Sequence, residues 1–496
     1  MGVIKRQGIK STIVNYFGVI IGFVGSLFIY PLNRDVHGNI LFLIAQAGII
    51  IPFLTFGFSG ILTKFYPVYK EKHGENGFIF FALLTILKTL VITVSCVFLV
   101  RYLALTFSIE QIPQIITNEL FYYTIIFGIT LTLIETFKQF SVNNLRITIP
   151  SILESIGFKL VIISTILLSL YFKVELHYLF LILFCFYLFN LFFLIVYNYK
   201  LNKKDFKKIR ISKIDKSFKT SLNNFWLFAG INSFGSMLIY NIDSYMIGNS
   251  ITKEHISIYS MFVVISGVII IPMRSFVNIA VPIVSTAMNN ENFKKINDLY
   301  KSLSTNLVIF GVFIFSIIWI NFPELFKIMS EGEIYKPYKN IFLFIGLAKI
   351  FDLSTSINHY IINFSKLYKI NFFTLILTAI LNVILNIYFI DLYGIIGVAI
   401  ATSISIFLLN LTNSIIVFFL FKMQPFQFNM VIPFGILIMI IAFSEEILLT
   451  EYFLSNVILK TGIFTSLFFT IVFYTKISTE INDNIHILVT KIKNLL

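Results

Sequence analysis

Long runs of apolar residues dominate this chain and leave few folds open to it. A helix needs about 20 predominantly apolar residues to cross the hydrocarbon core of a bilayer, and the 496 residues contain fourteen segments of that kind. Only 12% of the residues are charged, whereas soluble globular proteins carry about 25%. The sequence therefore predicts an all-α, polytopic membrane protein of about 14 transmembrane helices, and it argues against a soluble enzyme or a disordered chain.

The predicted spans follow one another with short connections, none longer than about 20 residues, which leaves no room for a soluble catalytic domain. The last two spans are shorter and are interrupted by Pro433 and Lys460, so a total of twelve stays open. Lys460 is expected to be an unpaired charge near one end of its span. The spans are expected at 11–30, 39–63, 78–100, 119–138, 147–171, 176–198, 222–247, 256–282, 302–321, 341–363, 371–390, 394–421, 430–448 and 455–475.

The distribution of Lys and Arg predicts the orientation, because these residues gather in cytoplasmic loops. With a cytoplasmic N-terminus, 26 of them lie on the cytoplasmic side, 8 on the opposite side and 4 inside spans. The segment 200–220 alone contributes nine. We therefore expect both termini in the cytoplasm, and the net charge of +14 requires no nucleic-acid partner.

The two halves of the chain resemble each other. An Ile-Ile-Ile-Pro sequence occurs at 49–52 and again at 269–272, and YPLNRDVHGN (30–39) corresponds in position to YNIDSYMIGN (240–249). Both halves begin in the cytoplasm, so the repeat is parallel, and two such lobes can rock around a central cavity as transporters do. The expected parts are an N-lobe of spans 1–6 (1–199), a basic cytoplasmic linker (200–220), a pseudo-symmetric C-lobe of spans 7–12 (221–423), and spans 13 and 14 with a cytoplasmic amphipathic tail (424–496).

Motifs of soluble catalysis are missing from the sequence. It contains no G-x-x-x-x-G-K-[ST] loop for ATP, no H-E-x-x-H and no Cys/His cluster. We expect no catalytic residues, no metal site and no cofactor. A G-x-x-x-G pattern at 18–22 lies in an apolar helix, where it predicts close helix packing.

Charged residues inside the spans are the candidates for function, because a charge within a bilayer is costly and usually faces an interior pathway. Glu135 and Lys138 lie three residues apart in span 4, as Lys349 and Asp352 do in span 10, so each pair can also be a structural ion pair within one helix. Arg274, just beyond Pro272, has no neighbour at that spacing, and its guanidinium matches phosphate. The substrate-cavity candidates are Arg274, Lys88, Lys159, Asp243, Lys349, Asp352 and Glu135.

The longest predicted external loop, 321–340, bears on a different class of function. A membrane polymerase or glycosyltransferase needs a large external loop with catalytic carboxylates or arginines. This loop is modest, and its acidic residues Glu324, Glu331 and Glu333 are expected to be solvated.

Several segments together resemble a known family. They are the N-terminal stretch IKSTIVNYFGVIIGFVGSLFIYPLNRDVHGN, the end of span 2 in KFYPVYKE, NIDSYMIG, and ISIYSMFVVISGVIIIPMRSFVNIAVPIVS. Over roughly residues 1–425 the chain resembles the Wzx-type polysaccharide-lipid flippases of the multidrug/oligosaccharidyl-lipid/polysaccharide exporter superfamily. Asp243 and Arg274 match the family pattern, whereas Lys88 and Lys159 are candidates only because of their position inside spans.

The resemblance implies a transporter and not an enzyme. It implies that an undecaprenyl-diphosphate-linked oligosaccharide moves from the cytoplasmic to the outer leaflet of a bacterial inner membrane, through a cationic central cavity with alternating access. Membrane lipids and polysaccharide polymerase or assembly proteins are the partners it implies. Related flippases also have basic cavity residues in spans 1 and 2, whereas this chain has only Arg34 and Lys64 at their ends. The same fold with another cargo, such as the peptidoglycan lipid precursor or a drug, stays open.

Overall fold

The structure is a computed structural model whose described residues form two compact units, Met1–Ser257 and Ile258–Leu496. We describe each unit by itself. Most of the basic linker predicted at 200–220 lies outside the described residues, so the predicted lobe boundaries stay a prediction. The described residues are 2–58, 61–62, 65, 78–107, 115, 118–201, 220, 226, 230, 233–235, 241–443, 452–478, 480 and 482.

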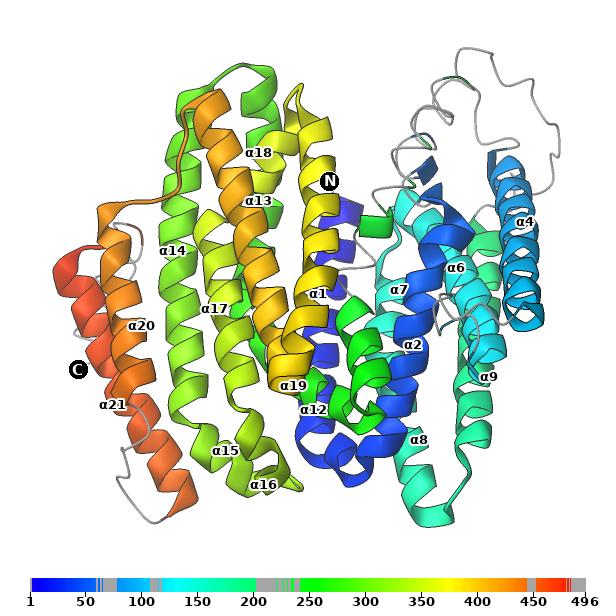
Figure 1. The fold of residues 1–496 in the computed structure, drawn as a ribbon. Helices are drawn as coiled ribbons and strands as arrows, with labels where there is room; N and C mark the ends of the chain where they lie inside the picture. Colours follow the sequence, from blue (N-terminus) through cyan, green and yellow to red (C-terminus); the bar gives the residue numbers. More distant parts are fainter. Residues whose placement is uncertain are drawn as a thin grey trace. The chain divides into compact units, whose positions relative to one another are not determined.

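The first unit is built from helices throughout its described part (Figure 1). Short π-helical or 3-10 segments connect the helix 2–24 to the helix 34–55 and the helix 148–152 to the helix 158–172, and residues 241–250 add a further helical segment. The elements are α1 (Gly2–Val24), η1 (Gly25–Ile29), η2 (Tyr30–Asn33), α2 (Arg34–Thr55), α4 (Phe78–Thr106), α6 (Phe121–Asn143), α7 (Thr148–Ile152), η3 (Leu153–Gly157), α8 (Phe158–Phe172) and α9 (Leu176–Leu201).

The second unit is also helical, and the first five residues of α12 (Lys253–Ser266) still belong to the first unit. The other elements are η4 (Gly267–Ile270), α13 (Ile271–Asn289), α14 (Phe293–Ile320), α15 (Phe322–Ile328), α16 (Gly332–Tyr335), η5 (Lys336–Tyr338), α17 (Asn340–Thr355), α18 (Asn358–Phe364), α19 (Tyr368–Phe421), η6 (Phe428–Met430), α20 (Val431–Phe443) and α21 (Phe453–Thr475).

The described helices confirm an all-α membrane protein. Nine of them are long and apolar enough to cross a membrane, or ten if the bent pair α17 and α18 is one span. On α4, Leu87, Ile92 and Tyr102 are each more than 60% exposed, as expected of a surface that meets lipid. The total of fourteen stays a prediction, since span 7 falls largely outside the described residues.

Helix α19 is two antiparallel helices that meet at Gly394, where φ is 57° and ψ is −135°. Hydrogen bonds join residues on opposite sides of this point: Thr374 Oγ1 donates to Asn413 Oδ1 at 3.2 Å, and Asn382 Nδ2 donates to Thr402 Oγ1 at 3.2 Å. Figure 1 shows the resulting hairpin in yellow and orange. The two spans expected at 371–390 and 394–421 are therefore separate helices, as the sequence predicts.

The predicted glycine contact of α1 is present in the first unit. A Cβ atom on Gly18 would lie 2.5 Å from the backbone oxygen of Ser155, and one on Gly22 would lie 2.9 Å from Nζ of Lys159. Ser155 also donates a hydrogen bond to the side chain of Asn15 at 2.7 Å. The G-x-x-x-G pattern thus lets α1 approach η3 and α8 closely, as glycines do in membrane helices.

The two Ile-Ile-Ile-Pro sequences both mark an interruption of helical structure, but at opposite ends of a helix. Pro52 lies in the last turn of α2, which ends before Phe56 at a φ of 45°. Pro272 lies in the first turn of α13, directly after the 3-10 turn η4. Proline suits both places because it ends or starts a helical hydrogen-bond ladder.

Candidate functional site

A cavity of about 230 Å³ lies inside the first unit, where α2, α6, α9 and the α7–η3–α8 segment meet. Most of its wall is apolar or aromatic, including Phe158 and Phe186. Its polar lining residues are Glu135, Lys138, Glu154, Tyr187 and Asn190. An apolar pocket with a few convergent polar groups is the usual form of a ligand site.

Three charged side chains meet at this cavity. Lys138 Nζ lies 3.3 Å from Oε1 of Glu135 and 2.6 Å from Oε2 of Glu154. The pairing of Glu135 with Lys138, one helical turn apart, is confirmed. Glu154 comes from a different element, and with its side chain 58% exposed, against 28% for Lys138, it lies toward the open side. We call Glu135, Lys138 and Glu154 the charged triad; its formal charge is −1.

The local fold explains why Glu154 reaches α6. It lies in the π-helical turn η3, between the short helix α7 and α8. A π-helical turn contains an extra residue compared with an α-helical turn and is often found at functional sites. The sequence marks Glu154 as a charge in span 5, but nothing in it indicates that the partner is Lys138 in span 4.

Asn190 on α9 is the cavity residue that sequence reasoning missed. It is 4% exposed, and among the described residues its side-chain oxygen has no hydrogen-bond partner. The available signal is an amide in the middle of the apolar run LILFCFYLFNLFF. A buried polar atom without a partner is uncommon and asks for an explanation.

The remaining candidates of the first unit lie elsewhere. Lys159 Nζ donates to the backbone oxygen of Gly18 at 2.5 Å, so it joins α8 to α1 and does not line the cavity. Lys88 is exposed on α4. Asp243 is buried, with 7% exposure, in the helical segment 241–250. Of the candidates whose side chains the structure describes in the first unit, Glu135 is the one that lines the cavity.

Arg274 lies on α13 in the second unit, three residues into the helix. Its side chain lies outside the described residues. Its role in a central substrate cavity therefore stays a prediction.

A direct ion pair of Lys349 with Asp352 is not among the ion pairs of the described residues, although the charge of Lys349 still acts on the Asp352 carboxylate. The carboxylate of Asp352 instead accepts a hydrogen bond from Asn410 Nδ2 of α19 at 3.0 Å. Asn410 Oδ1 also accepts bonds from Thr355 Oγ1 at 3.1 Å and from Asn358 Nδ2 at 3.3 Å. A neutral amide on a neighbouring helix thus supplies the direct hydrogen bond to Asp352.

These bonds surround a break in the helix predicted at 341–363. Helices α17 and α18 are bent by 48° relative to each other. Ser356 lies at the break with a φ of 35°, and its hydroxyl is 2.8 Å from that of Ser304 on α14. Asn410 contacts residues on both sides of the break, so the bend is held by side-chain hydrogen bonds.

Glu324 is not solvated, contrary to expectation. It is 2% exposed on α15, and Lys460 Nζ of α21 lies 3.0 Å from its Oε1. Asn456 Nδ2 donates to the same oxygen. Lys460, expected as an unpaired charge, is therefore one partner of a buried ion pair. Helical spacing could not show this, since the two residues lie 136 positions apart.

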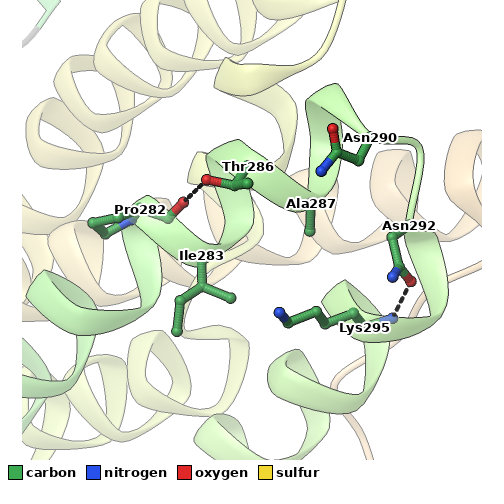
Figure 2. A pocket seen from close by; sticks show the side chains of 7 residues that line it. All are labelled: Pro282, Ile283, Thr286, Ala287, Asn290, Asn292 and Lys295. Carbon is green, nitrogen blue, oxygen red and sulfur yellow. Dashed lines mark hydrogen bonds between the residues drawn. The ribbon is translucent and has the colours of Figure 1, made fainter.

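A second cavity, of about 310 Å³, lies in the second unit where α13 ends and α14 begins. Figure 2 shows the side chain of Lys295 beside it. Asn292 caps α14 by accepting a bond from the backbone N–H of Lys295 at 3.1 Å. Thr286 Oγ1 donates to the backbone oxygen of Pro282 at 2.9 Å. Asn292 thus serves the start of α14, and Thr286 bonds within α13.

Metal-ligating side chains are not gathered in the described part of the chain. Within it, no three His, Cys, Asp or Glu residues lie close enough to hold a metal ion together. The charged triad supplies two such residues, Glu135 and Glu154, and its third member is a lysine.

Comparisons with known proteins bear on the fold. No family model matches the chain, and no curated protein matches its sequence. The lipid II flippase MurJ, solved in an inward closed conformation, is 18% identical; the match covers 95% of this chain and 99% of that one, with a TM-score of 0.61. An inward-facing multidrug resistance transporter of the MATE family is 10% identical over 88% and 99% of the two chains, with a TM-score of 0.53. A MATE structure in complex with MaL6 is 11% identical over 85% and 96%, with a TM-score of 0.54. The chain therefore has the fold of the MOP-superfamily transporters.

Proposed function

We propose that this protein is a flippase of lipid-linked oligosaccharides. It moves an undecaprenyl-diphosphate-linked oligosaccharide from the cytoplasmic to the outer leaflet of a bacterial inner membrane, for the synthesis of a surface polysaccharide such as O-antigen or lipopolysaccharide. The observation that carries the proposal is the structural likeness to a lipid flippase over 95% of the chain. The Wzx-like segments of the sequence support the oligosaccharide cargo.

The physical task of such a protein is to shield a headgroup. A diphosphate with several sugars cannot enter hydrocarbon, because stripping its water without replacement is very costly. Two lobes that open alternately to each side present polar and cationic groups to the headgroup, while the polyprenyl tail stays in lipid. The sequence has no ATP-binding loop, so an ion gradient, the membrane potential or consumption of the product drives the cycle.

Arg274 is the residue that we propose as the first contact of the diphosphate. It follows Pro272 in the half of the predicted span 256–282 that the charge distribution assigns to the cytoplasmic side. A guanidinium presents a planar set of donors that matches two phosphate oxygens, and a surrounding of low dielectric strengthens the contact. Lys88, Asp243, Lys349 and Asp352 are further candidates for the walls of the path.

The test is transport of a fluorescent undecaprenyl-diphosphate oligosaccharide in proteoliposomes, with membrane abundance measured in parallel. We expect Arg274→Ala to lower transport by about tenfold or more at normal abundance, since one charge-assisted contact contributes about 1.5–3 kcal/mol. Arg274→Lys should be intermediate, because it keeps the charge but loses the two-pronged geometry.

The control is Lys336→Met, which alters an exposed lysine of the η5 turn and should leave transport unchanged. Full transport by Arg274→Ala at normal abundance would refute the role of Arg274. Wild-type protein that transports no lipid-linked oligosaccharide would refute the function.

A second candidate is the same fold with another cargo. The negative charge of the triad, together with the likeness to MATE transporters, favours a cationic drug, whereas the likeness to MurJ favours the peptidoglycan lipid precursor. Offering the three cargoes to the same proteoliposomes separates these functions. A polymerase is less well supported, because Glu324 of the loop 321–340 is bound by Lys460 and buried.

A further inference from the structure

We propose that the break between α17 and α18 is a two-state hinge of the second unit. In one state the two helices are bent by 48°, as observed, and in the other the segment 340–364 is one continuous helix. The side chain of Asn410 is the latch that holds the bent state. The hinge does not depend on the proposed function, because it follows from contacts within the second unit alone.

The sequence of this segment does not itself require a break. It contains no proline, and its one glycine, Gly346, lies ten residues before Ser356. Sharp bends in helices usually arise at proline, at glycine–serine pairs, at π-bulges or where a group inserts into the hydrogen-bond ladder. The turn within α19 is different, because Gly394 has a φ of 57° that glycine adopts readily. A segment able to continue as a helix is thus bent by its surroundings, and a change in those surroundings permits the straight form.

The backbone of Ser356 is strained in the bent state. Its φ is 35° and its ψ is −79°, a combination that is unfavourable for a residue with a Cβ atom. Strain of this kind persists only where surrounding contacts impose it. Ser356 is 4% exposed, and its hydroxyl lies 2.8 Å from that of Ser304. In a continuous helix Ser356 returns to helical angles, so the backbone favours the straight state and the contacts favour the bent one.

Asn410 makes the contacts that hold the bend. It is 6% exposed on the second arm of α19, and its Nδ2 donates to Asp352 Oδ1 at 3.0 Å, before the break. Its Oδ1 accepts from Thr355 Oγ1 at 3.1 Å, at the end of α17, and from Asn358 Nδ2 at 3.3 Å, at the start of α18. A buried amide that loses such partners is costly. One side chain therefore stabilises the bent state from both sides of the break.

Hydroxyl groups lower the cost of the break for the backbone. The last carbonyls of a helix lose their helical partners where it ends. Here Ser354 Oγ donates to the backbone oxygen of Phe351 at 2.7 Å, and Thr355 Oγ1 donates to that of Asp352 at 3.1 Å. Serine and threonine form the same kind of bond inside continuous helices. These carbonyls therefore have a partner in either state.

The hinge connects two differently packed parts of the second unit. Helix α17 packs closely on α14, since a Cβ atom on Gly346 would lie 2.6 Å from the ring of Phe315. Helix α18 instead shares a buried apolar cluster with α13, which includes Ile361 and Val284. Straightening therefore moves α18 and α13 relative to α14 and α17. If the protein is the flippase proposed above, this motion shifts the helix that carries Arg274.

The test measures distances between spin labels in the purified full-length chain, in lipid nanodiscs, after Cys96 and Cys185 are replaced by serine. Seven helical residues are about 10 Å long, so a rotation by 48° displaces the far end of α18 by several ångströms. One label at Lys366→Cys, just past α18, and one at Lys294→Cys, on α14, report this displacement by double electron–electron resonance. The pair Asn340→Cys and Lys294→Cys joins α17 to α14 and should give one unchanged distance.

Two variants should shift the balance toward the straight state. We expect Asn410→Ala, which removes the latch, and Ser356→Ala, which favours a helix, each to raise the ratio of straight to bent by about tenfold or more, the equivalent of about 1.4 kcal/mol. Ser356→Gly should enrich the bent state and raise the thermal midpoint, because glycine adopts a φ of 35° without strain. Asn413→Ala is the matched control, since Asn413 is also buried on the second arm of α19 but bonds to Thr374; it should leave the distances unchanged.

The outcomes decide each part of the proposal. The same single distance between positions 366 and 294 in the wild type and in the double variant Asn410→Ala with Ser356→Ala would overturn the hinge. An equal shift in Asn413→Ala would overturn the role of Asn410 as the latch. A lower thermal midpoint for Ser356→Gly than for the wild type would overturn the strain at Ser356. If Asn410→Ala does not fold, Ser356→Ala and Ser356→Gly still decide, because they should shift the distances in opposite directions.

Transport assays separate the hinge from the function, because the distances are measured without cargo. Distances that shift as expected, in a protein that moves no lipid-linked oligosaccharide, support the hinge and refute the flippase. Transport of that lipid by a protein whose distances never change supports the flippase and refutes the hinge.

Discussion

At the scale of single residues, the buried pair of Glu324 and Lys460 has the clearest energetic consequence. The two side chains are 2% and 6% exposed, so neither charge has much water around it. Removing one member of a buried pair leaves the other uncompensated, at a cost of about 3–5 kcal/mol, whereas apolar replacement of both is often neutral. We therefore expect Lys460→Met to lower the thermal midpoint clearly, and Glu324→Leu with Lys460→Met to recover most of the loss.

The measurement is thermal unfolding of the purified single and double variants. Lys336→Met is the control, because its partner Glu333 is exposed, and exposed pairs contribute about 0–1 kcal/mol. A double variant less stable than Lys460→Met would contradict the pairing as its cause. Removal of the residues after Gln424 deletes both Lys460 and Asn456, so transport lost in such a truncation reports in part on an unpaired Glu324.

At the scale of elements, the packing of α1 depends on two glycines that differ in what they face. Gly18 faces the backbone of Ser155, which cannot move without its helix, whereas Gly22 faces the flexible end of Lys159. We expect Gly18→Ala to destabilise the protein by about 1–3 kcal/mol, as overpacking does. Gly22→Ala should cost less, because the lysine side chain can swing away.

Gly462 on α21 supplies the matched control, since a Cβ atom there meets nothing within 4 Å. In such a helical position, alanine is more favourable than glycine by about 0.5–1 kcal/mol. The thermal midpoint should therefore be highest for Gly462→Ala, lower for Gly22→Ala and lowest for Gly18→Ala. Equal midpoints for Gly18→Ala and Gly462→Ala would show that α1 does not approach η3 closely.

At the scale of the whole molecule, the orientation in the membrane is open to a direct experiment. The charge distribution assigns the 200–220 linker to the cytoplasm and the 321–340 loop to the outside. Cys96 and Cys185 are exposed and free, so both are first replaced by serine. In intact cells, a membrane-impermeant maleimide should then label Lys336→Cys but not Lys204→Cys, and Lys204→Cys should react after permeabilisation. Labelling of position 204 but not of position 336 from outside would show that the chain has the opposite orientation.

The sequence by itself determined where most of the described helices form and one contact within a helix. A bilayer forces each span to satisfy its backbone hydrogen bonds internally, so apolar length locates helices such as α14 and both arms of α19. The pair Glu135–Lys138 was predictable for the same reason, because a spacing of three places both side chains on one helical face. The G-x-x-x-G pattern indicated that α1 packs closely against a neighbour, but not that the neighbour is Ser155.

Only the tertiary structure decided the contacts between helices. Glu154 reaches Lys138, and Lys460 reaches Glu324 over 136 positions, because of how helices are rotated and shifted against each other. Helical periodicity specifies which residues share a face but not which face meets which. For that reason the direct hydrogen bond to Asp352 comes from Asn410 on another helix, and Asn190 becomes part of a charged cavity that no spacing in the sequence indicates.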